Sequence, residues 1–246
     1  MGNHFIVEIG YNFQEECLKA DNGRYASIDL GVNNLATITS NVFKPFIING
    51  KPVKSINHFY NKEIAKKKSK LPTGIYSSKY IQNLYRKRNN KITDYFHKVS
   101  TYIVNQLVSN QVNTLVIGYN SGWKQDIDMG KKNNQNFAYI PFCKLINMLE
   151  YKCVLKGITV VSNEESYTSK CSFLDDEPIC KHERYMGKRV KRGMFKSSDG
   201  TIINADANGS LNILKKYLIK IAVWNSKIRE DLIKVCRTPN LCKITI

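Results

Sequence analysis

Apolar and polar positions in the first third of the chain follow the pattern of a β-sheet. Residues 25–39 (YASIDLGVNNLATIT) form two short apolar segments, and the polar GVNN between them is typical of a tight turn. This pattern predicts a β-hairpin that carries Asp29 on its first strand. A third strand is expected within residues 46–56 (FIINGKPVKSI), with Asn49-Gly50 as a second tight turn. The fold is therefore expected to open with an antiparallel meander.

The pattern changes to a helical one over residues 61–111. Pro72 and Gly74 divide this region into a short helix and a long one, and apolar residues in the long helix recur at near-helical spacing from about residue 78 onward. The region is expected to form a helical insertion.

A βαβ unit is predicted after this insertion. Residues 114–120 (TLVIGYN) are a buried strand by their β-branched run, a helix starts at Pro141 and ends at Gly157, and residues 158–161 resume a strand. A crossover helix makes the two strands parallel. The predicted fold class is α/β, with a mixed sheet in which an antiparallel meander is followed by a parallel βαβ unit, plus helical and loop insertions.

A further helix is expected near the C-terminus. Asp206 precedes it in NADANGSLNILKKYLIK, and leucines at positions 211, 214 and 218 share one face. The tail after Trp224 is polar and is expected to be peripheral, apart from residues 243–246 (KITI) at its end.

Composition and charge point to the kind of partner. The chain has 246 residues, 42% of them hydrophobic, which suffices for the core of about one domain. It has 38 basic and 20 acidic residues, a net charge of +18, and this excess indicates a polyanion such as nucleic acid. A solvated helix face is the alternative for the basic residues of the insertion. The candidate nucleic-acid contacts are Lys66, Lys67, Lys68, Arg86, Lys87, Arg88, Lys124, Lys188, Arg189, Lys191 and Arg192.

Other function classes are disfavoured. The chain lacks the run of about 18 apolar residues that a membrane span needs, and the acids near its start do not suit a signal peptide. Seven irregularly spaced cysteines do not suggest a disulfide framework, so a cytoplasmic location is expected. The glycine-rich phosphate-binding motifs of nucleotide hydrolases are absent.

Two aspartates occupy positions that suit metal-dependent hydrolysis. An opening meander with Asp29 on its first strand, followed at the end by Asp206 beside a late helix, is the layout of an RNase H-like nuclease. Such enzymes hold two Mg²⁺ about 4 Å apart. Magnesium prefers hard oxygen ligands, which carboxylates supply. Taken singly, each aspartate could instead belong to a turn or a helix cap.

Several segments together resemble the TnpB (OrfB) proteins of insertion sequences, which are relatives of type V CRISPR nucleases. SIDLGVNNLAT, GYNSGWKQ, ESYTSKCSF and NADANGSLNI carry the resemblance, which extends from about residue 25 to 216. It implies a RuvC-like nuclease domain over residues 25–222 of an RNA-guided DNA endonuclease that uses Mg²⁺ or Mn²⁺. The implied partners are DNA and a guide RNA from the transposon end, without a membrane. In this resemblance Asp29 matches the first catalytic aspartate and Asp206 the last.

The chain departs from the family at the second catalytic acid. The family's glutamate lies on the strand that here reads TLVIGYN, and Gly118 stands in its place. Glu164 and Glu165 follow the neighbouring parallel strand, and strands in a sheet lie about 4.8 Å apart, so a carboxylate there can reach the same metals. We expect a rearranged site of Asp29, Glu165 and Asp206, with Glu165 favoured over Glu164. The alternative is a nuclease-dead protein that binds RNA or DNA.

Two further departures concern the insert and the N-terminus. The four-cysteine zinc ribbon of the family is reduced over residues 167–203 to Cys171, Cys180 and His182, so this insert is expected to fold without zinc. Residues 1–24 resemble the remnant of the family's N-terminal barrel-like domain, and residues 223–246 form a C-terminal tail. A truncated transposon remnant therefore stays an alternative function. The sequence does not indicate an oligomeric state.

Overall fold

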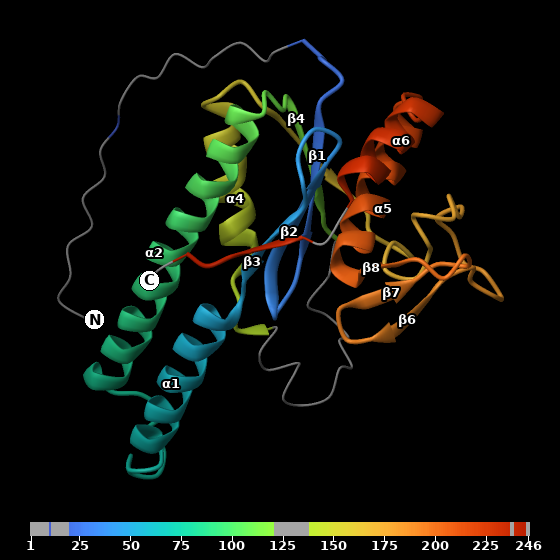
Figure 1. Cartoon of the computed structure of the whole chain (residues 1–246). Helices are drawn as coiled ribbons and strands as arrows, with labels where there is room; N and C mark the ends of the chain where they lie inside the picture. Colours follow the sequence, from blue (N-terminus) through green and yellow to red (C-terminus); the bar gives the residue numbers. More distant parts are fainter. Residues whose placement is uncertain (1–9, 11–19, 121–137, 237–238, 245–246) are drawn as a thin grey trace.

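A six-stranded mixed sheet forms the centre of the protein in a computed structural model that describes residues 10, 20–120, 138–236 and 239–244. The strand order is β5-β4-β1-β2-β3-β9 (Figure 1). The antiparallel meander consists of β1 (Tyr25–Leu30), β2 (Asn34–Ser40) and β3 (Phe46–Asn49). In the parallel part, β4 (Thr114–Gly118) pairs with β1, and β5 (Thr159–Asn163) pairs with β4. The predicted fold class is confirmed.

Helices cover both faces of this sheet. On one face lie α1 (Lys51–Lys68), α2 (Lys79–Ser109) and α4 (Phe142–Val154), and on the other lie α5 (Ala205–Lys220) and α6 (Ser226–Val235) (Figure 1). Side chains alternate along β1: Ala26, Ile28 and Leu30 join the larger apolar core with α1, α2 and α4. The residues between them, Ser27 and Asp29, therefore face α5. This alternation places the candidate catalytic aspartate on the α5 side.

The start of α1 corrects one prediction. The third strand was expected to continue through a turn to residue 56, but β3 ends at Asn49 and the helix begins at Lys51. Pro52 lies in the first turn, where its missing N–H costs nothing. Gly50 donates its N–H to the Asn33 carbonyl at 2.8 Å, and a Cβ at Gly50 would lie 2.3 Å from the Val32 carbonyl oxygen. The Asn-Gly pair thus packs against the β1–β2 turn and starts a helix.

The C-terminal tail contributes more than its polar sequence suggested. Strand β9 (Asn240–Cys242) pairs in parallel with β3 at the edge of the sheet. Leu232 of α6 is buried in a second apolar cluster with Leu214 and Leu218 of α5. The expectation of a peripheral tail is therefore wrong for these two elements.

The region before α5 contains a small antiparallel sheet. It consists of β6 (Lys188–Lys191), β7 (Met194–Lys196) and β8 (Ile202–Asn204). Ahead of it, the loops are tied by Glu177, whose side chain is buried and accepts the N–H of Ser172 at 2.7 Å and of Met186 at 2.9 Å. One carboxylate thus links two loops that lie 14 residues apart.

This arrangement predicts a large effect of Glu177 on the stability of the fold. Hydrogen bonds to a charged group contribute about 1.5–3 kcal/mol each, so Glu177→Gln should lower the free energy of unfolding by about 2 kcal/mol. Urea unfolding measures it. Glu183→Gln, at an exposed position of the same insert, is the matched control and should change stability little. Equal losses in the two variants would contradict the linking role of Glu177.

Within the described part of the chain, no helix is both long and apolar enough to cross a lipid bilayer.

Candidate active site

Asp29 lies near the end of β1, beneath the first turns of α5. Its Oδ2 atom is 2.9 Å from the position that a Cβ would take at Gly209, so the helix can approach the carboxylate this closely because residue 209 is glycine. Burial raises the pKa of Asp29 well above its usual range, and the charges of Glu165 and then Asp206 raise it further, while Arg189 lowers it. Asp29 therefore stands in a negative field made by two other carboxylates.

Glu165 follows β5 and reaches over the end of β4. Its N–H donates to Asn120 Oδ1 at 3.0 Å, and its carbonyl accepts the Thr168 hydroxyl at 2.7 Å. Its Oε2 atom lies 2.9 Å from the Cβ position of Gly118. Burial, followed by the charge of Glu164, raises the pKa of Glu165 to about 7. The carboxylate thus occupies the space where a side chain at position 118 would begin.

Asp206 lies in the first turn of α5. Asn204 caps the helix by accepting the N–H groups of Asp206 and Ala207, both at 3.0 Å. The Asp206 side chain accepts Asn34 Nδ2 on Oδ2 at 2.6 Å and Arg189 Nη2 on Oδ1 at 3.0 Å. It was expected to precede the helix, but it is the second helical residue, where a negative charge favours the helix dipole.

Glu164 is directed elsewhere. It forms an ion pair with Lys216 of α5, and more than half of its side chain is exposed. Of the two candidate glutamates, the structure brings Glu165 to Asp29 and leaves Glu164 paired with a lysine.

The donor set of Asp29, Glu165 and Asp206 suits a hard divalent cation. All three groups offer carboxylate oxygens, and the raised pKa values of Asp29 and Glu165 are typical of buried acids that lie close to other acids. In residues 10, 20–120, 138–236 and 239–244, however, no group of three or more His, Cys, Asp or Glu side chains is arranged to hold a metal ion. Arg189 and Asn34 instead engage both oxygens of Asp206. The residues fit magnesium by chemistry, and Arg189 and Asn34 use two of the roughly four lone-pair sites of the Asp206 carboxylate.

The weak zinc candidates lie together only in part. Cys180 Sγ is 3.4 Å from His182 Nε2, whereas Cys171 Sγ donates to the Cys180 carbonyl at 3.6 Å. His182 Nε2 also lies 2.7 Å from the Pro178 carbonyl oxygen and 3.9 Å from Glu177 Oε1. Glu177 and His182 thus connect these loops through hydrogen bonds and a close contact.

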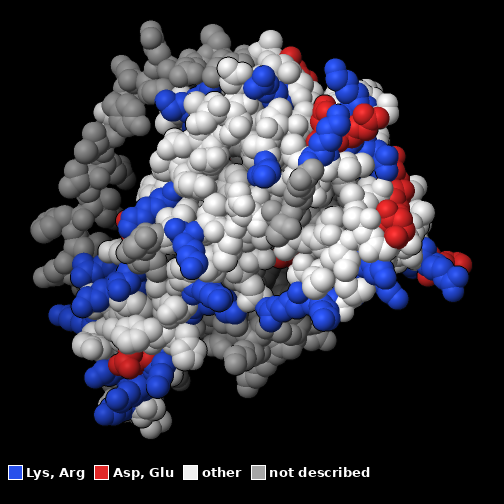
Figure 2. Space-filling view, viewed as in Figure 1, with Lys and Arg blue, Asp and Glu red and all other residues white. Residues whose placement is uncertain are grey.

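The candidate nucleic-acid contacts lie on helices α1 and α2 and at strand β6, apart from Lys124. Lys66, Lys67 and Lys68 end α1, and Arg86 and Lys87 lie on α2, where basic side chains gather on the surface (Figure 2). Lys188, Lys191 and Arg192 are exposed on and beside β6, whereas Arg189 of that strand pairs with Asp206. Arg88 is buried, so it does not belong to an exposed basic face of the helix. Lys124 lies outside the described residues.

The pattern of the sequence did not single out Asn34 as a site residue. It was placed in the β1–β2 turn as a turn residue, and it is the first residue of β2, with its amide on Asp206. Asn34 lies five residues after Asp29 on a tight hairpin, and this spacing could have indicated that the two side chains belong to one site.

Comparison with known proteins shows which proteins the chain resembles. A family model described as OrfB_IS605, probable transposase, matches residues 8–124, and a model of the Cas12f1-like TNB domain matches residues 142–213. The chain resembles the TnpB (OrfB) family. The TnpB-like protein ORF457 of Acidianus two-tailed virus is 25% identical over 80% of this chain, and Cas12f2, a CRISPR-associated endodeoxyribonuclease of a Micrarchaeota archaeon, is 29% identical over 78%. The chain spans 43% and 36% of the length of those two relatives.

Solved structures confirm the fold of the chain. A Cas12f1 in complex with sgRNA and target DNA superimposes with a TM-score of 0.61 at 21% identity, covering 81% of this chain and 39% of that one. A CRISPR-Cas12f ternary complex gives a TM-score of 0.60 at 17% identity, covering 84% of this chain and 41% of that one. The RuvC-like, RNase H-type fold expected from the sequence is therefore present.

Proposed function

We propose that this chain carries the nuclease domain of an RNA-guided DNA endonuclease. The observation that supports this proposal most directly is the convergence of Asp29, Glu165 and Asp206 from β1, the end of β5 and the start of α5. The domain would span residues 25–222, with the helical insertion at 61–111 and the insert at 167–203. DNA would be the substrate, and an RNA from the transposon end would be the guide. Base pairing with that guide would then read the target sequence.

Asp29, Glu165 and Asp206 would hold the metal ions in this proposal. Bound Mg²⁺ or Mn²⁺ supplies Lewis acidity and lowers the pKa of bound water. The chain's own groups orient the phosphodiester. Arg189, now on Asp206, has further N–H donors for a phosphate oxygen, and Asn34 holds the second Asp206 oxygen in place. A site of three carboxylates would thus be formed with an acid that follows β5 in place of one from β4.

A nuclease-dead binding protein is the second candidate. The ion pair between Arg189 and Asp206 supports it, because that contact offsets negative charge that would otherwise attract a metal ion. A fragment that binds the transposon's RNA would share this state.

A cleavage assay distinguishes the two candidates. Protein purified with co-expressed transposon-end RNA is incubated with single- and double-stranded DNA and Mg²⁺ or Mn²⁺, beside Asp29→Ala and Glu165→Ala. Cleavage that both substitutions remove supports the nuclease. RNA binding without cleavage by the unsubstituted protein supports the binding protein.

Nucleic-acid binding should also depend steeply on salt. Lysines that contact phosphates release counterions, so each contact contributes about −0.9 to the slope of log K against log salt concentration for duplex DNA. Replacing Lys66, Lys67 and Lys68 together with glutamine should reduce that slope by about 2 to 3. The matched control replaces Lys220, Lys227 and Lys234 of α5 and α6, on the other side of the sheet. An unchanged slope in the α1 variant would show that the end of this helix does not contact the nucleic acid.

A further inference from the structure

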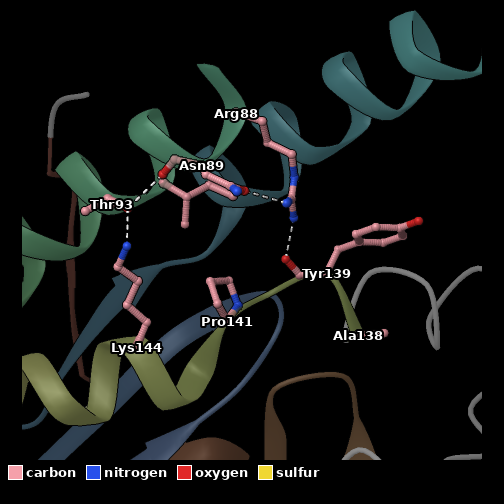
Figure 3. A pocket seen from close by; sticks show the side chains of 8 residues that line it. Arg88, Asn89, Thr93, Ala138, Tyr139, Pro141 and Lys144 are labelled. Atoms are coloured by element: carbon pink, nitrogen blue, oxygen red, sulfur yellow. Dashed lines mark hydrogen bonds between the residues drawn. The ribbon is translucent and has the colours of Figure 1, made fainter. Parts of the chain in front are cut away.

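A cavity of about 300 Å³ lies between α2 and α4, on the face of the sheet opposite the carboxylates. Its size is at the lower end of the range of small-molecule sites. The side chains that line it come from both helices and from the segment before α4 (Figure 3). They are Arg88, Asn89, Ile92, Thr93, Ala138, Tyr139, Pro141 and Lys144. Two of these eight residues are basic and none is acidic.

Arg88 is a buried cation whose partners in the described chain are neutral oxygens. It is 8% exposed, and its guanidinium donates to Asn57 Oδ1 at 2.8 Å, Asn89 Oδ1 at 3.0 Å and the Tyr139 carbonyl at 2.6 Å. These bonds use three of the five N–H donors, which leaves one on each terminal nitrogen. Burial of a charge is costly unless it is paired with an opposite charge. The same burial lowers the pKa of Arg88. An anion would offset this cost.

Lys144 places a second positive charge at the cavity. Its Nζ donates to Thr93 Oγ1 at 2.7 Å, across from α4 to α2 (Figure 3). Lys144 lies in the first turn of α4, which has no acidic residue although the helix dipole favours one there. The nearby acid on α2, Asp94, is paired with Lys98 at 2.9 Å. Two fixed cations and a helix N-terminus therefore face this cavity without a carboxylate among its lining residues.

We propose that this cavity binds a phosphate group of a nucleic-acid backbone, held by the two Arg88 N–H donors that no described residue engages and by Lys144. The Thr93 hydroxyl, which donates to the Asn89 carbonyl at 2.8 Å, accepts Lys144 Nζ and so positions this lysine. Arg88 supplies the planar fork that suits phosphate oxygens, and Lys144 supplies a point charge. The exposed tyrosine ring of Tyr139, 5.3 Å from the Arg88 guanidinium carbon, borders the entrance and keeps the arginine in place. The site lies apart from the carboxylates, so it would anchor a strand without contacting the reacting bond. Only the source of the phosphate rests on the proposed function.

Inorganic phosphate tests the site without nucleic acid or cleavage. Calorimetric titration of the full chain, at constant ionic strength set with chloride, should show one phosphate bound. Lys144→Met should weaken that binding at least tenfold. Lys144 is exposed, so this variant should fold. Lys156→Met, an exposed lysine just beyond the other end of α4, removes the same charge away from the cavity and should leave phosphate binding unchanged.

A second variant and a nucleic-acid measurement complete the test. Thr93→Val keeps both cations but removes the hydroxyl oxygen that holds Lys144 Nζ, and it should weaken phosphate binding several-fold. Lys144→Met should reduce the salt slope for an RNA–DNA hybrid, duplex DNA or single-stranded RNA by about 1, and the responding substrate identifies the strand. Absence of phosphate binding, or equal binding by the Lys144 and Lys156 variants, would overturn the site. Phosphate binding with no slope change for any nucleic acid would overturn the backbone as its source.

These outcomes are independent of the nuclease. A protein that binds phosphate through Lys144 and cuts no DNA would retain this site and refute the proposed activity. A protein that cuts DNA and binds no phosphate would support the proposed activity and refute the phosphate site.

Discussion

Replacing Asp29 with asparagine is expected to abolish DNA cleavage and, at the same time, to stabilise the metal-free protein. Loss of a metal-holding carboxylate removes several kcal/mol of transition-state stabilisation, which corresponds to a rate about a thousandfold lower. The asparagine side chain has nearly the same shape and lacks the charge that burial, Glu165 and Asp206 disfavour. Function and stability should therefore move in opposite directions.

The stability gain should depend on pH with a definite sign. An acid whose pKa is raised by folding holds its proton more tightly in the folded state, so the native protein loses stability as pH rises toward the raised pKa. Asp29→Asn removes that loss. The variant should exceed the unsubstituted protein in free energy of unfolding by about 1–2 kcal/mol at pH 8, and the difference should shrink toward pH 4. Urea unfolding in the presence of a chelator measures the free energy of unfolding of both proteins at about pH 8 and about pH 4.

Asp175→Asn is a matched control with the opposite sign. Burial raises the pKa of Asp175, but hydrogen bonds from Ser172 and Ser198 outweigh this and lower it overall. This aspartate therefore contributes stability at neutral pH that is lost on acidification. Asp175→Asn should destabilise the protein and leave cleavage unchanged. Cleavage retained by Asp29→Asn, or destabilisation of that variant at pH 8, would refute the site assigned to Asp29.

The regular elements of the fold could be predicted because their signals are local. The hairpin turn, the β-branched strand β4 and the amphipathic helix α4 are each decided by residues near in sequence, and the parallel βαβ unit follows from their order. The start of α1 was missed because Asn49-Gly50 is equally typical of a hairpin turn. Strand β9 was missed because its pairing with β3 is decided by contacts almost 200 residues apart along the chain.

The site could be predicted as residue types and strand ends, but its detailed contacts could not. Asp29 and Asp206 were identified from motifs, and Glu165 from the neighbouring parallel strand. Arg189 contacts Asp206 from β6, and Asn34 contacts it from β2. Both contacts depend on how these strands lie against α5, which no local sequence pattern encodes. Likewise, Arg88 was interpreted as part of an exposed basic face, and its burial against Tyr139 became visible only in three dimensions.

Glu165→Ala is expected to reduce cleavage about a thousandfold, and a carboxylate introduced at position 118 should restore part of it. Gly118 ends β4, and the Glu165 carboxylate lies 2.9 Å from its Cβ position. A glutamate side chain from residue 118 would start in the space that Glu165 now fills. Its carboxylate would approach Asp29 from the adjacent strand, because β4 pairs with β1.

The exchange needs one additional change. A Cβ at Gly118 would lie 2.4 Å from Cδ1 of the buried Ile213 and 3.2 Å from its Cγ1. Ile213→Val removes the Cδ1 methyl at a cost of about 0.5–1.5 kcal/mol. The triple variant with Gly118→Glu, Glu165→Ala and Ile213→Val should therefore cleave at least tenfold faster than the variant with Glu165→Ala and Ile213→Val, in which position 118 is still glycine.

Two controls decide whether the carboxylate itself is responsible for rescue. Gly118→Gln in the same background fills the space without a charge and should restore no cleavage, because a neutral amide is a weaker ligand for a hard cation. Glu164→Ala, which removes the glutamate paired with Lys216, should keep most of the activity. Rescue by glutamine would show that packing at the end of β4 matters rather than the acid. Loss of cleavage in Glu164→Ala, together with activity in Glu165→Ala, would exchange the roles of the two glutamates.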